Sequence, residues 1–174
     1  NSDDEGRVGT QRQQMCKYRL SDVIQNRALL GQLCESKFGS LHVQKLLENE
    51  KTGNWENVEL FVYVLCRKGV LLEMSQDKYA NYVVQKVLEL FCENAQWYPG
   101  HTRKESLAKS ILLKLVKGHV EKLATNAFSC RILQKIFKYP SKYMAIKLEI
   151  VNEIMGRPDR FQVFLLHHLG HINE

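Results

Sequence analysis

The sequence predicts an all-α fold built from stacked helical repeats, and three observations support this prediction. A motif that combines an aromatic residue, a small residue, a glutamine and a lysine occurs three times without an internal gap. Its copies lie 41 and then 49 residues apart, which falls in the period range of solenoid proteins. Between the copies, apolar residues are mostly spaced as on one face of a helix, so each unit would need its neighbours to bury that face.

The three copies of the motif keep one register at every position that defines it. We number the five-residue core of each copy from one to five, and the cores are SLHVQ from residue 40, NYVVQ from residue 81 and CRILQ from residue 130. An aromatic residue lies two positions before each core, at Phe38, Tyr79 and Phe128. Because these rings share one template position, we expect them to be buried between successive repeats.

The chain begins with a polar segment over residues 1–17, which we expect to be a disordered lead-in. Residues 1–14 contain no apolar residue except Val8, too little to hold the segment on a core. The run LSDVI from Leu20 predicts a short helix within 18–26. This helix would cover the open end of the first repeat, as a solenoid requires.

Three repeats follow, over about 27–67, 68–117 and 118–156. In each repeat a short first helix precedes the helix that carries the motif, and an outer helix closes the unit. The second repeat is longer because residues 94–102 contain a Pro-Gly turn signal and form a loop.

Residues 157–174 continue the template as a fourth repeat that stops before its glutamine could occur. The apolar side chains of this segment would lack a partner beyond it. We therefore expect either that the chain is part of a longer protein or that another chain covers this face.

The cores place an unusual set of side chains on one face of each motif helix. In the second repeat, Asn81 and Gln85 lie one helical turn apart and point the same way, and Tyr82 lies beside them. Two amides beside an exposed ring suit a splayed-out nucleobase, because the amides can pair with its Watson–Crick edge while the ring contacts its face. The pattern favours a protein that binds single-stranded RNA.

The cores SLHVQ, NYVVQ and CRILQ resemble the tripartite recognition motifs of the Pumilio (PUF) family, and the resemblance covers residues from about 20 to 174. Their order resembles the N-terminal repeats of a Pumilio homology domain, and the loop before Arg103 is faintly similar to one in nematode germline members. The resemblance implies a right-handed α-solenoid of three-helix repeats that reads one base per repeat. It also implies action on the 3′ untranslated regions of messenger RNAs, with translational repression through co-repressors or deadenylase recruitment in the full-length protein.

The resemblance implies a role for each position of the core. Positions one and five would read base edges: Ser40 with Gln44 for adenine, Asn81 with Gln85 for uracil, and Cys130 with Gln134 for adenine. Position two would stack between neighbouring bases, at Leu41, Tyr82 and Arg131. Leu41 departs from the family pattern, because its aliphatic side chain replaces the usual arginine or aromatic ring. Since such proteins run antiparallel to RNA, repeats three, two and one would read 5′-A-U-A-3′.

A lysine follows each position-five glutamine, at Lys45, Lys86 and Lys135. Each lysine is rotated by about 100° from the glutamine that precedes it. The three could form a ladder of phosphate contacts along the edge of the RNA-binding groove. They could equally be solvated residues of exposed helix faces.

Composition and charge fit this class of protein. Of the 174 residues, 44% are hydrophobic and 25% are charged, and a net charge of +6 with a pI near 9.1 favours an anionic partner. The five cysteines are scattered without a CxxC pair, which indicates a reducing compartment and disfavours disulfides or zinc. No apolar run has the length of a membrane span and no signal peptide is visible, so we expect a cytoplasmic protein without a membrane partner.

Catalysis and cofactor binding find little support in the sequence. No paired-carboxylate, nucleophile or phosphate-loop motif occurs, so we expect a binding protein without a cofactor and not an enzyme. His167, His168 and His171 include a pair at zinc-capable spacing. No nearby Glu or Cys completes the three or four ligands that a zinc site needs, so we expect no metal site.

Two other interpretations remain open at this level. A HEAT- or armadillo-like solenoid would explain the period but not a glutamine that recurs beside a stacking residue. A PUF-like solenoid could instead act mainly as a protein-interaction scaffold, or bind structured RNA without a base code. The intact cores of the second and third repeats argue against a loss of base reading.

Overall fold

The computed structural model describes residues 2–93 and 101–156, with side chains described from residue 9 and, after the gap, from residue 103. The elements of these residues are helices, and the described part of the chain contains no strand, which confirms the all-α fold class. The chain divides into two compact units, residues 1–90 and 91–174.

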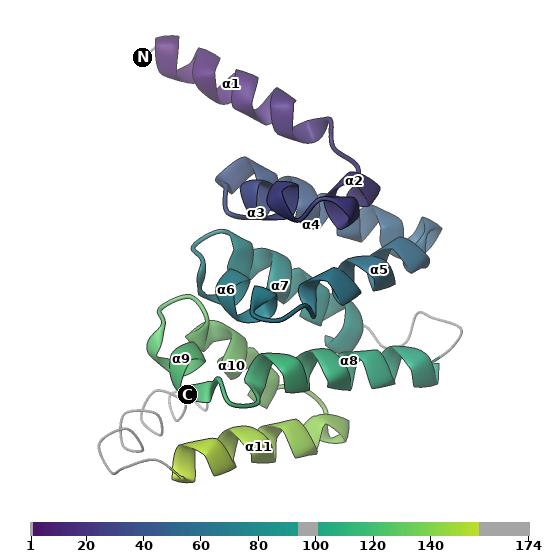
Figure 1. The fold of residues 1–174 in the computed structure, drawn as a ribbon, viewed down its shortest axis with the longest axis vertical. Helices are drawn as coiled ribbons and strands as arrows, with labels where there is room; N and C mark the ends of the chain where they lie inside the picture. The colour runs from purple at the N-terminus through teal and green to yellow at the C-terminus, as the bar shows by residue number, and fades with distance from the viewer. Residues whose placement is uncertain (1, 94–100, 157–174) are drawn as a thin grey trace. The chain divides into compact units, whose positions relative to one another are not determined.

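The described residues of the first unit form seven α-helices, three of which precede the helix that carries the first core (Figure 1). Their bounds are α1 Ser2–Cys16, α2 Leu20–Gln25, α3 Arg27–Cys34, α4 Lys37–Gly53, α5 Trp55–Leu65, α6 Val70–Gln76 and α7 Ala80–Leu88. A π-helical turn, η1 Glu89–Glu93, continues α7. The motif helices of this unit are therefore α4 and α7.

The lead-in is helical and not disordered, in contrast to the expectation for residues 1–17. Helix α1 contacts α4, although most of its described side chains are exposed. Its described residues include Gln11, Arg12, Gln13 and Gln14, which are good helix formers. Local propensity together with contact to a folded helix therefore outweighs the low apolar content that suggested disorder.

The core of the first unit lies between the short, motif and outer helices. Helix α4 contacts α3, α5 and α7, and α6 packs on α7. The inward side chains of the motif helices are fully buried, among them Val43, Leu47, Val83 and Val87. Leu20 and Val23 of α2 are also fully buried, against α3 and α5, so α2 covers apolar side chains of the first repeat. This packing fixes which face of α4 and α7 is left for polar residues.

The second unit contains α8 His101–Val116, α9 Val120–Thr125, α10 Cys130–Phe137, a 3-10 turn η3 Ser141–Tyr143, and α11 Met144–Met155 (Figure 1). Helix α11 packs against α8 and α9, and α10 packs against α9. The motif helix α10 buries Ile132, Leu133 and Ile136. Positions one, two and five of the third core, Cys130, Arg131 and Gln134, are not buried.

A polar cap begins the motif segment of each of the three described repeats, four positions before the core. The Ser36 hydroxyl oxygen accepts from the amide of Gly39 at 3.1 Å. Asp77 Oδ1 accepts from the amides of Tyr79 and Ala80 at 2.8 and 2.7 Å. Asn126 Oδ1 accepts from the amides of Phe128 and Ser129 at 2.9 and 3.0 Å. These caps satisfy amides that the helix itself leaves unpaired, and their shared offset is a repeat signal that the sequence analysis did not use.

The residue directly before each core is small because the preceding short helix comes close to it. A Cβ atom at Gly39 would lie 2.1 Å from the backbone oxygen of Leu33, well inside contact distance. Ala80 holds the equivalent position in α7 and is fully buried. In the third repeat Ser129 uses the contact differently, since its hydroxyl donates to the Leu123 oxygen at 2.8 Å.

The aromatic residues two positions before each core are half-buried, so the expectation that they are buried between repeats is not met. In two repeats the preceding lysine covers part of the ring. The amine of Lys37 lies 6.0 Å from the Phe38 ring centre, and that of Lys78 lies 5.3 Å from the Tyr79 ring centre. A cation near a ring face is attracted to it, so the ring need not be buried completely.

Glycines in the left-handed conformation separate the repeats. Gly69 has φ of +83° at the start of α6, and Gly118 has φ of +76° just before α9. A side chain would be strained at either position. The amide of Gly118 also donates to the carboxylate of Glu153 on α11, which ties this turn to the outer helix.

Some expectations lie outside the described residues. They concern most of the loop at 94–102, the fourth repeat at 157–174, and the three histidines at 167, 168 and 171. Among the residues that the structure does describe, none of the helices combines the length and the apolar character needed to cross a membrane. No cluster of three or more metal-ligating side chains occurs in that part of the chain either.

Candidate functional site

The position-one residues of α4 and α7 are buried, whereas their position-five glutamines are half-buried. Ser40 and Asn81 are each only 2% exposed. Gln44 and Gln85 lie one turn further along and reach the surface. Since α4 contacts α7, two pairs of hydrogen-bonding side chains lie on adjacent helices of one unit.

The Asn81 side chain is already engaged with its own helix. Its Nδ2 atom donates to the backbone oxygens of Asp77 and Lys78 at 2.8 and 2.9 Å. Its Oδ1 atom accepts from Nε2 of Gln85 at 2.9 Å. Both amide hydrogens of Asn81 are therefore used, and its oxygen fixes the orientation of the Gln85 amide.

Ser40 plays the equivalent part in α4 and also links the two motif helices. Its hydroxyl donates to the backbone oxygen of Tyr79 at 2.8 Å, at the start of the second motif segment. The same oxygen accepts from Nε2 of Gln44 at 3.2 Å. In both repeats a buried position-one residue thus holds a glutamine whose oxygen and second amide hydrogen have no partner among the described residues.

The third core differs from the first two. Cys130 is partly exposed, and its thiol lies 3.5 Å from the backbone oxygen of Ala127. Gln134 is half-buried, and its side chain makes no hydrogen bond within the described part of the chain. A thiol is a weak hydrogen-bonding group, which explains why position one does not hold this glutamine.

The position-two residues are exposed in all three repeats, as stacking would require. Leu41 is 49% exposed and Tyr82 is 45% exposed. Arg131 is exposed on α10. Each of them follows directly after a position-one residue, so each offers a flat or apolar surface beside the amides.

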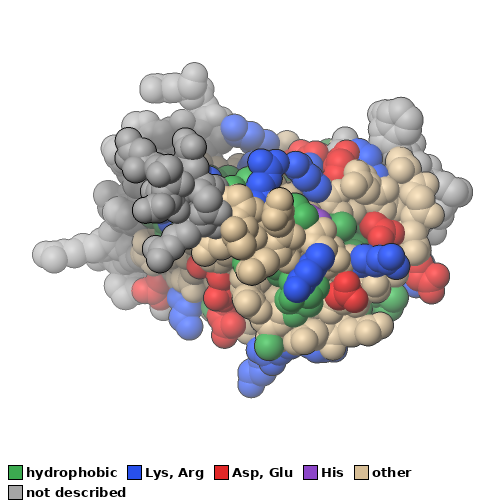
Figure 2. All heavy atoms as spheres, turned by 90° about the horizontal axis from the view of Figure 1, so that it is seen from above, with side chains coloured by type: hydrophobic (Ala, Val, Ile, Leu, Met, Phe, Trp, Pro, Cys, Tyr) green, Lys and Arg blue, Asp and Glu red, His purple; other side chains and the backbone are tan. Residues whose placement is uncertain are grey.

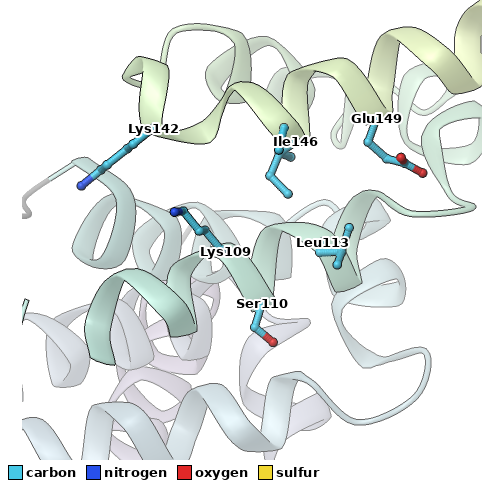
Figure 3. A pocket seen from close by; sticks show the side chains of 7 residues that line it. Lys109, Ser110, Leu113, Lys142, Ile146 and Glu149 are labelled. Carbon is cyan, nitrogen blue, oxygen red and sulfur yellow. The ribbon is translucent and has the colours of Figure 1, made fainter. Parts of the chain in front are cut away.

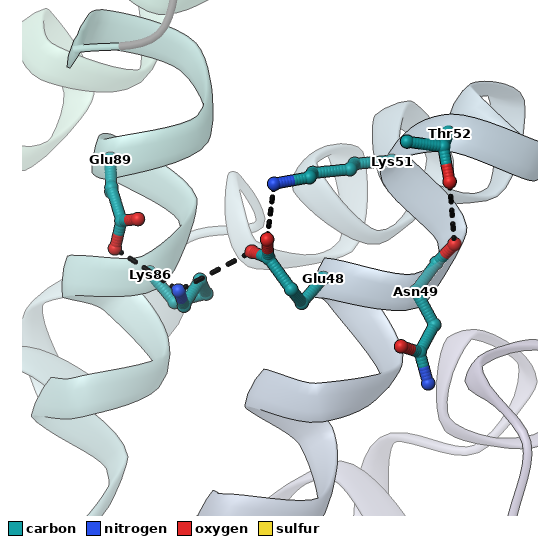
Figure 4. A network of polar contacts seen from close by, with 6 residues as sticks. All are labelled: Glu48, Asn49, Lys51, Thr52, Lys86 and Glu89. Atoms are coloured by element: carbon teal, nitrogen blue, oxygen red, sulfur yellow. Dashed lines mark hydrogen bonds and ion pairs between the residues drawn. The ribbon is translucent and has the colours of Figure 1, made fainter.

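The three lysines after the glutamines are not equivalent. Lys86 forms ion pairs with Glu89 at 3.1 Å and with Glu48 of α4 at 3.4 Å. Figure 4 shows Glu48 placed between Lys51 and Lys86, and both amines reach its carboxylate. The hydrogen bond from Lys51 and the charge of Lys86 hold the pKa of Glu48 below its ordinary value.

Lys45 and Lys135 differ from Lys86 in this respect. Lys45 is exposed and Lys135 is half-buried, and neither forms an ion pair with another described residue. The three lysines therefore differ in the free chain, and a ladder of phosphate contacts stays a prediction.

Charge is not gathered into one basic field on the face that Figure 2 draws. Lysines and arginines alternate there with acidic side chains over the described residues.

A separate hollow of about 520 Å³ lies between α8 and α11 in the second unit. Figure 3 shows Lys109 and Lys142 near each other at one end, with Leu113 and Glu149 towards the other end. Its remaining lining residues are Ser110, Ala145 and Ile146. None of the lining residues belongs to a core or directly follows one.

Burial shifts the pKa of several ionisable groups. Burial raises the pKa of Cys34 and of Cys92 to about 12, so both remain neutral thiols. Burial also lowers the pKa of Lys104 on α8 to about 8. These directions follow from the cost of placing a charge in an apolar interior.

A search with models of known families finds the family described as "Pumilio-family RNA binding repeat". Its model matches residues 31–52, 71–96 and 119–155, and each match contains one of the three cores. A curated relative is Fem-3 mRNA-binding factor 2 of Caenorhabditis elegans, which is 23% identical over 129 residues.

That alignment covers 74% of this chain and 19% of the relative, so the aligned part spans about a fifth of that protein's length. No solved structure gives a significant match to the chain. The resemblance that the cores suggested is confirmed by an independent family model in three separate segments. The chain therefore belongs to the Pumilio family of repeat proteins.

Proposed function

We propose that the chain binds single-stranded RNA with one base at each core, and that it acts in the post-transcriptional regulation of messenger RNA. The recurrence of a half-buried glutamine beside an exposed position-two side chain in three repeats supports this proposal. The relative named as an mRNA-binding factor supports the same class of ligand.

In the second repeat, Gln85 would make the outermost contact with uracil. Its oxygen can accept from the base N3–H, and its second amide hydrogen can donate to a carbonyl oxygen. Asn81 holds that amide in place through its 2.9 Å bond, so the glutamine is oriented before the base arrives. Because the Gln85 side chain is already ordered, less conformational entropy is lost when the base binds.

The adenines would be read by Ser40 with Gln44 and by Cys130 with Gln134. Each glutamine can donate to one ring nitrogen and accept from an amino group, which suits the Watson–Crick edge of adenine. Repeats three, two and one would then read 5′-A-U-A-3′, the order proposed for the three cores.

Position two would supply stacking, which contributes about 1–3 kcal/mol per base. Tyr82 and Arg131 offer planar groups, whereas Leu41 offers an aliphatic contact. Three bases give roughly 3–9 kcal/mol before the cost of association, so we expect micromolar to millimolar affinity for this chain alone.

The base code is tested at the second repeat with the double variant Asn81→Ser and Gln85→Glu. The carboxylate can accept from both N1–H and the amino group of guanine, whereas uracil offers one donor flanked by acceptors. Preference at this nucleotide should change from U to G by about 1–3 kcal/mol, or roughly 5- to 150-fold. Competition binding with RNAs that differ only at this base measures the change, and Gln85→Glu alone is the control for the role of Asn81.

The flanking adenines should remain preferred in this double variant, because the cores that contain Gln44 and Gln134 are unchanged. An equal loss of affinity for all four bases would show that Asn81 and Gln85 support the helix and do not read RNA. Binding of scrambled RNA as tightly as AUA-containing RNA by the native chain would contradict the base code itself.

The proposal extends to the cellular role that the resemblance implies. The chain would act without catalysis or a cofactor, in the cytoplasm, on elements in 3′ untranslated regions. Co-repressors or a deadenylase recruited by the full-length protein would then carry out repression. Reporter messages with and without an AUA-containing 3′ element test this role, because only the former should respond to the protein.

A protein-binding role is a second candidate function, favoured by the hollow between α8 and α11. Its apolar lining and its two lysines at one end suit a peptide that carries an apolar and an acidic side chain. Leu113→Asp should abolish binding of such a peptide and leave RNA affinity unchanged. Loss of RNA binding in this variant would show that the hollow is not a separate site.

A further inference from the structure

The three repeats differ in the charge of the residue that follows one helical turn after the position-five glutamine. Four residues after the position-five glutamine lie Glu48, Glu89 and Lys138, which we call position nine. Positions one, five and nine are spaced by about one helical turn, so they follow one face of the motif helix. Glu89 and Lys138 directly follow the last residues of α7 and α10 and keep right-handed helical backbone angles, so the row continues through them.

The position-nine carboxylates of the first two repeats both neutralise one lysine, that of the second repeat. Glu48 and Glu89 both pair with Lys86, at 3.4 and 3.1 Å, and Lys51 also contacts Glu48. An approaching phosphate would have to displace one of these carboxylates and would face the other. Lys45, although exposed, lies one turn before Glu48 on the same helix.

In the third repeat the charge at position nine is positive and not negative, because Lys138 replaces the glutamate. Lys138 is exposed and Lys135 is half-buried, three residues apart and on neighbouring turns of one helix surface. Neither forms an ion pair with a described residue. Two like charges repel each other, so an anion near both would remove a repulsion that the free chain tolerates.

We propose that Lys135 and Lys138 form a phosphate-binding site for the RNA backbone at the third repeat, while Lys86 serves as a structural ion-pair partner that holds α4 to α7. This inference rests on the proposed function, because it requires that RNA follows the core rows. It assigns the electrostatic part of binding to α10 and leaves α4 and α7 with base contacts.

The test is the dependence of RNA affinity on salt concentration. Each phosphate neutralised on a single strand contributes about 0.7 to the slope of log K against log salt. This slope is negative, and Lys135→Gln and Lys138→Gln should each reduce its magnitude by about 0.7. Lys86→Gln should leave it unchanged, as should Lys117→Gln, which removes an exposed lysine outside the cores.

A second variant, which removes the two carboxylates, should change the salt dependence in the opposite direction. Glu48→Gln with Glu89→Gln releases Lys86 from both carboxylates. Lys86 could then contact a phosphate, so the magnitude of the slope should increase by about 0.7. Adding Lys86→Gln to that double variant should remove the increase. The measurement uses the 174-residue chain, an AUA-containing single-stranded RNA, and circular dichroism to confirm that every variant remains helical.

The outcomes separate this inference from the proposed function. Detectable RNA binding in which Lys86→Gln reduces the magnitude of the slope as much as Lys138→Gln would overturn the inference alone. Equal effects of Lys117→Gln and Lys138→Gln would do the same, because they would indicate a diffuse charge effect. Absence of any RNA binding by the native chain would overturn the proposed function and this inference with it.

Discussion

The motif helices of the first unit and the motif helix of the second share a template but not a hydrogen-bond pattern. In α4 and α7, the buried Ser40 and Asn81 each hold the glutamine of their core. In α10, Cys130 is partly exposed and Gln134 has no side-chain bond within the described residues. The same glutamine is therefore fixed in two repeats and less constrained in the third.

This difference shows that a position-one residue can orient the position-five glutamine of its own core. A hydroxyl or an amide can hold the glutamine amide, whereas a thiol holds it poorly. The first unit also links its two motif helices through the Ser40 contact to Tyr79 and the Lys86 contact to Glu48. We infer that preorganisation in this family member is distributed unequally among repeats.

The largest expected difference between the two units is in the stability lost when the small residue before a core is replaced by alanine. Gly39→Ala should destabilise the chain by about 1–3 kcal/mol, because the new Cβ would overlap the Leu33 oxygen and force a backbone shift. Ser129→Ala should cost only about 1 kcal/mol, since it removes one hydrogen bond and fits the space. Denaturant unfolding measures both, and a neutral Gly39→Ala would refute the close approach of α3 to α4.

A smaller difference is expected at position one. Ser40→Ala should cost about 1 kcal/mol, because the Tyr79 oxygen and Gln44 both lose a partner. Cys130→Ala should change stability by less than about 0.5 kcal/mol, as is usual for substitutions of groups without strong bonds. If thermal unfolding gives equal values for the two variants, the contrast between the units is wrong.

The smallest expected effect is the pH dependence of the Glu48 ion pairs. Since the folded pKa of Glu48 lies below its ordinary value of 4.5, this carboxylate stabilises the fold above that pH. The contribution is lost as pH falls through the folded pKa, because protonation removes the partner of Lys51 and Lys86. An exposed pair contributes at most about 1 kcal/mol.

Glu48→Gln should therefore flatten the acid limb of the stability curve, as followed by denaturant unfolding between neutral and acid pH. Lys138→Gln, at the same position of the third repeat, should leave that limb unchanged. An unaltered acid limb in Glu48→Gln would show that the ion pairs of Figure 4 contribute nothing in solution.

The repeat fold and the family followed from the sequence because they depend on local, recurring features. The register of the glutamines, the small residue before each core and the helical spacing of apolar residues are all visible in one chain. The caps at Ser36, Asp77 and Asn126, and the charge at position nine, were equally readable at fixed offsets and were missed.

What the sequence could not determine depends on contacts between residues far apart in the chain. The pairing of Lys86 with Glu48 joins residues 38 positions apart, and the Ser40 bond to Tyr79 joins residues 39 positions apart. Periodicity shows which face a side chain occupies but not which neighbour it meets. The packing of α4 on α7 decided that Ser40 bonds to the start of the second motif segment and that Lys86 is neutralised by Glu48.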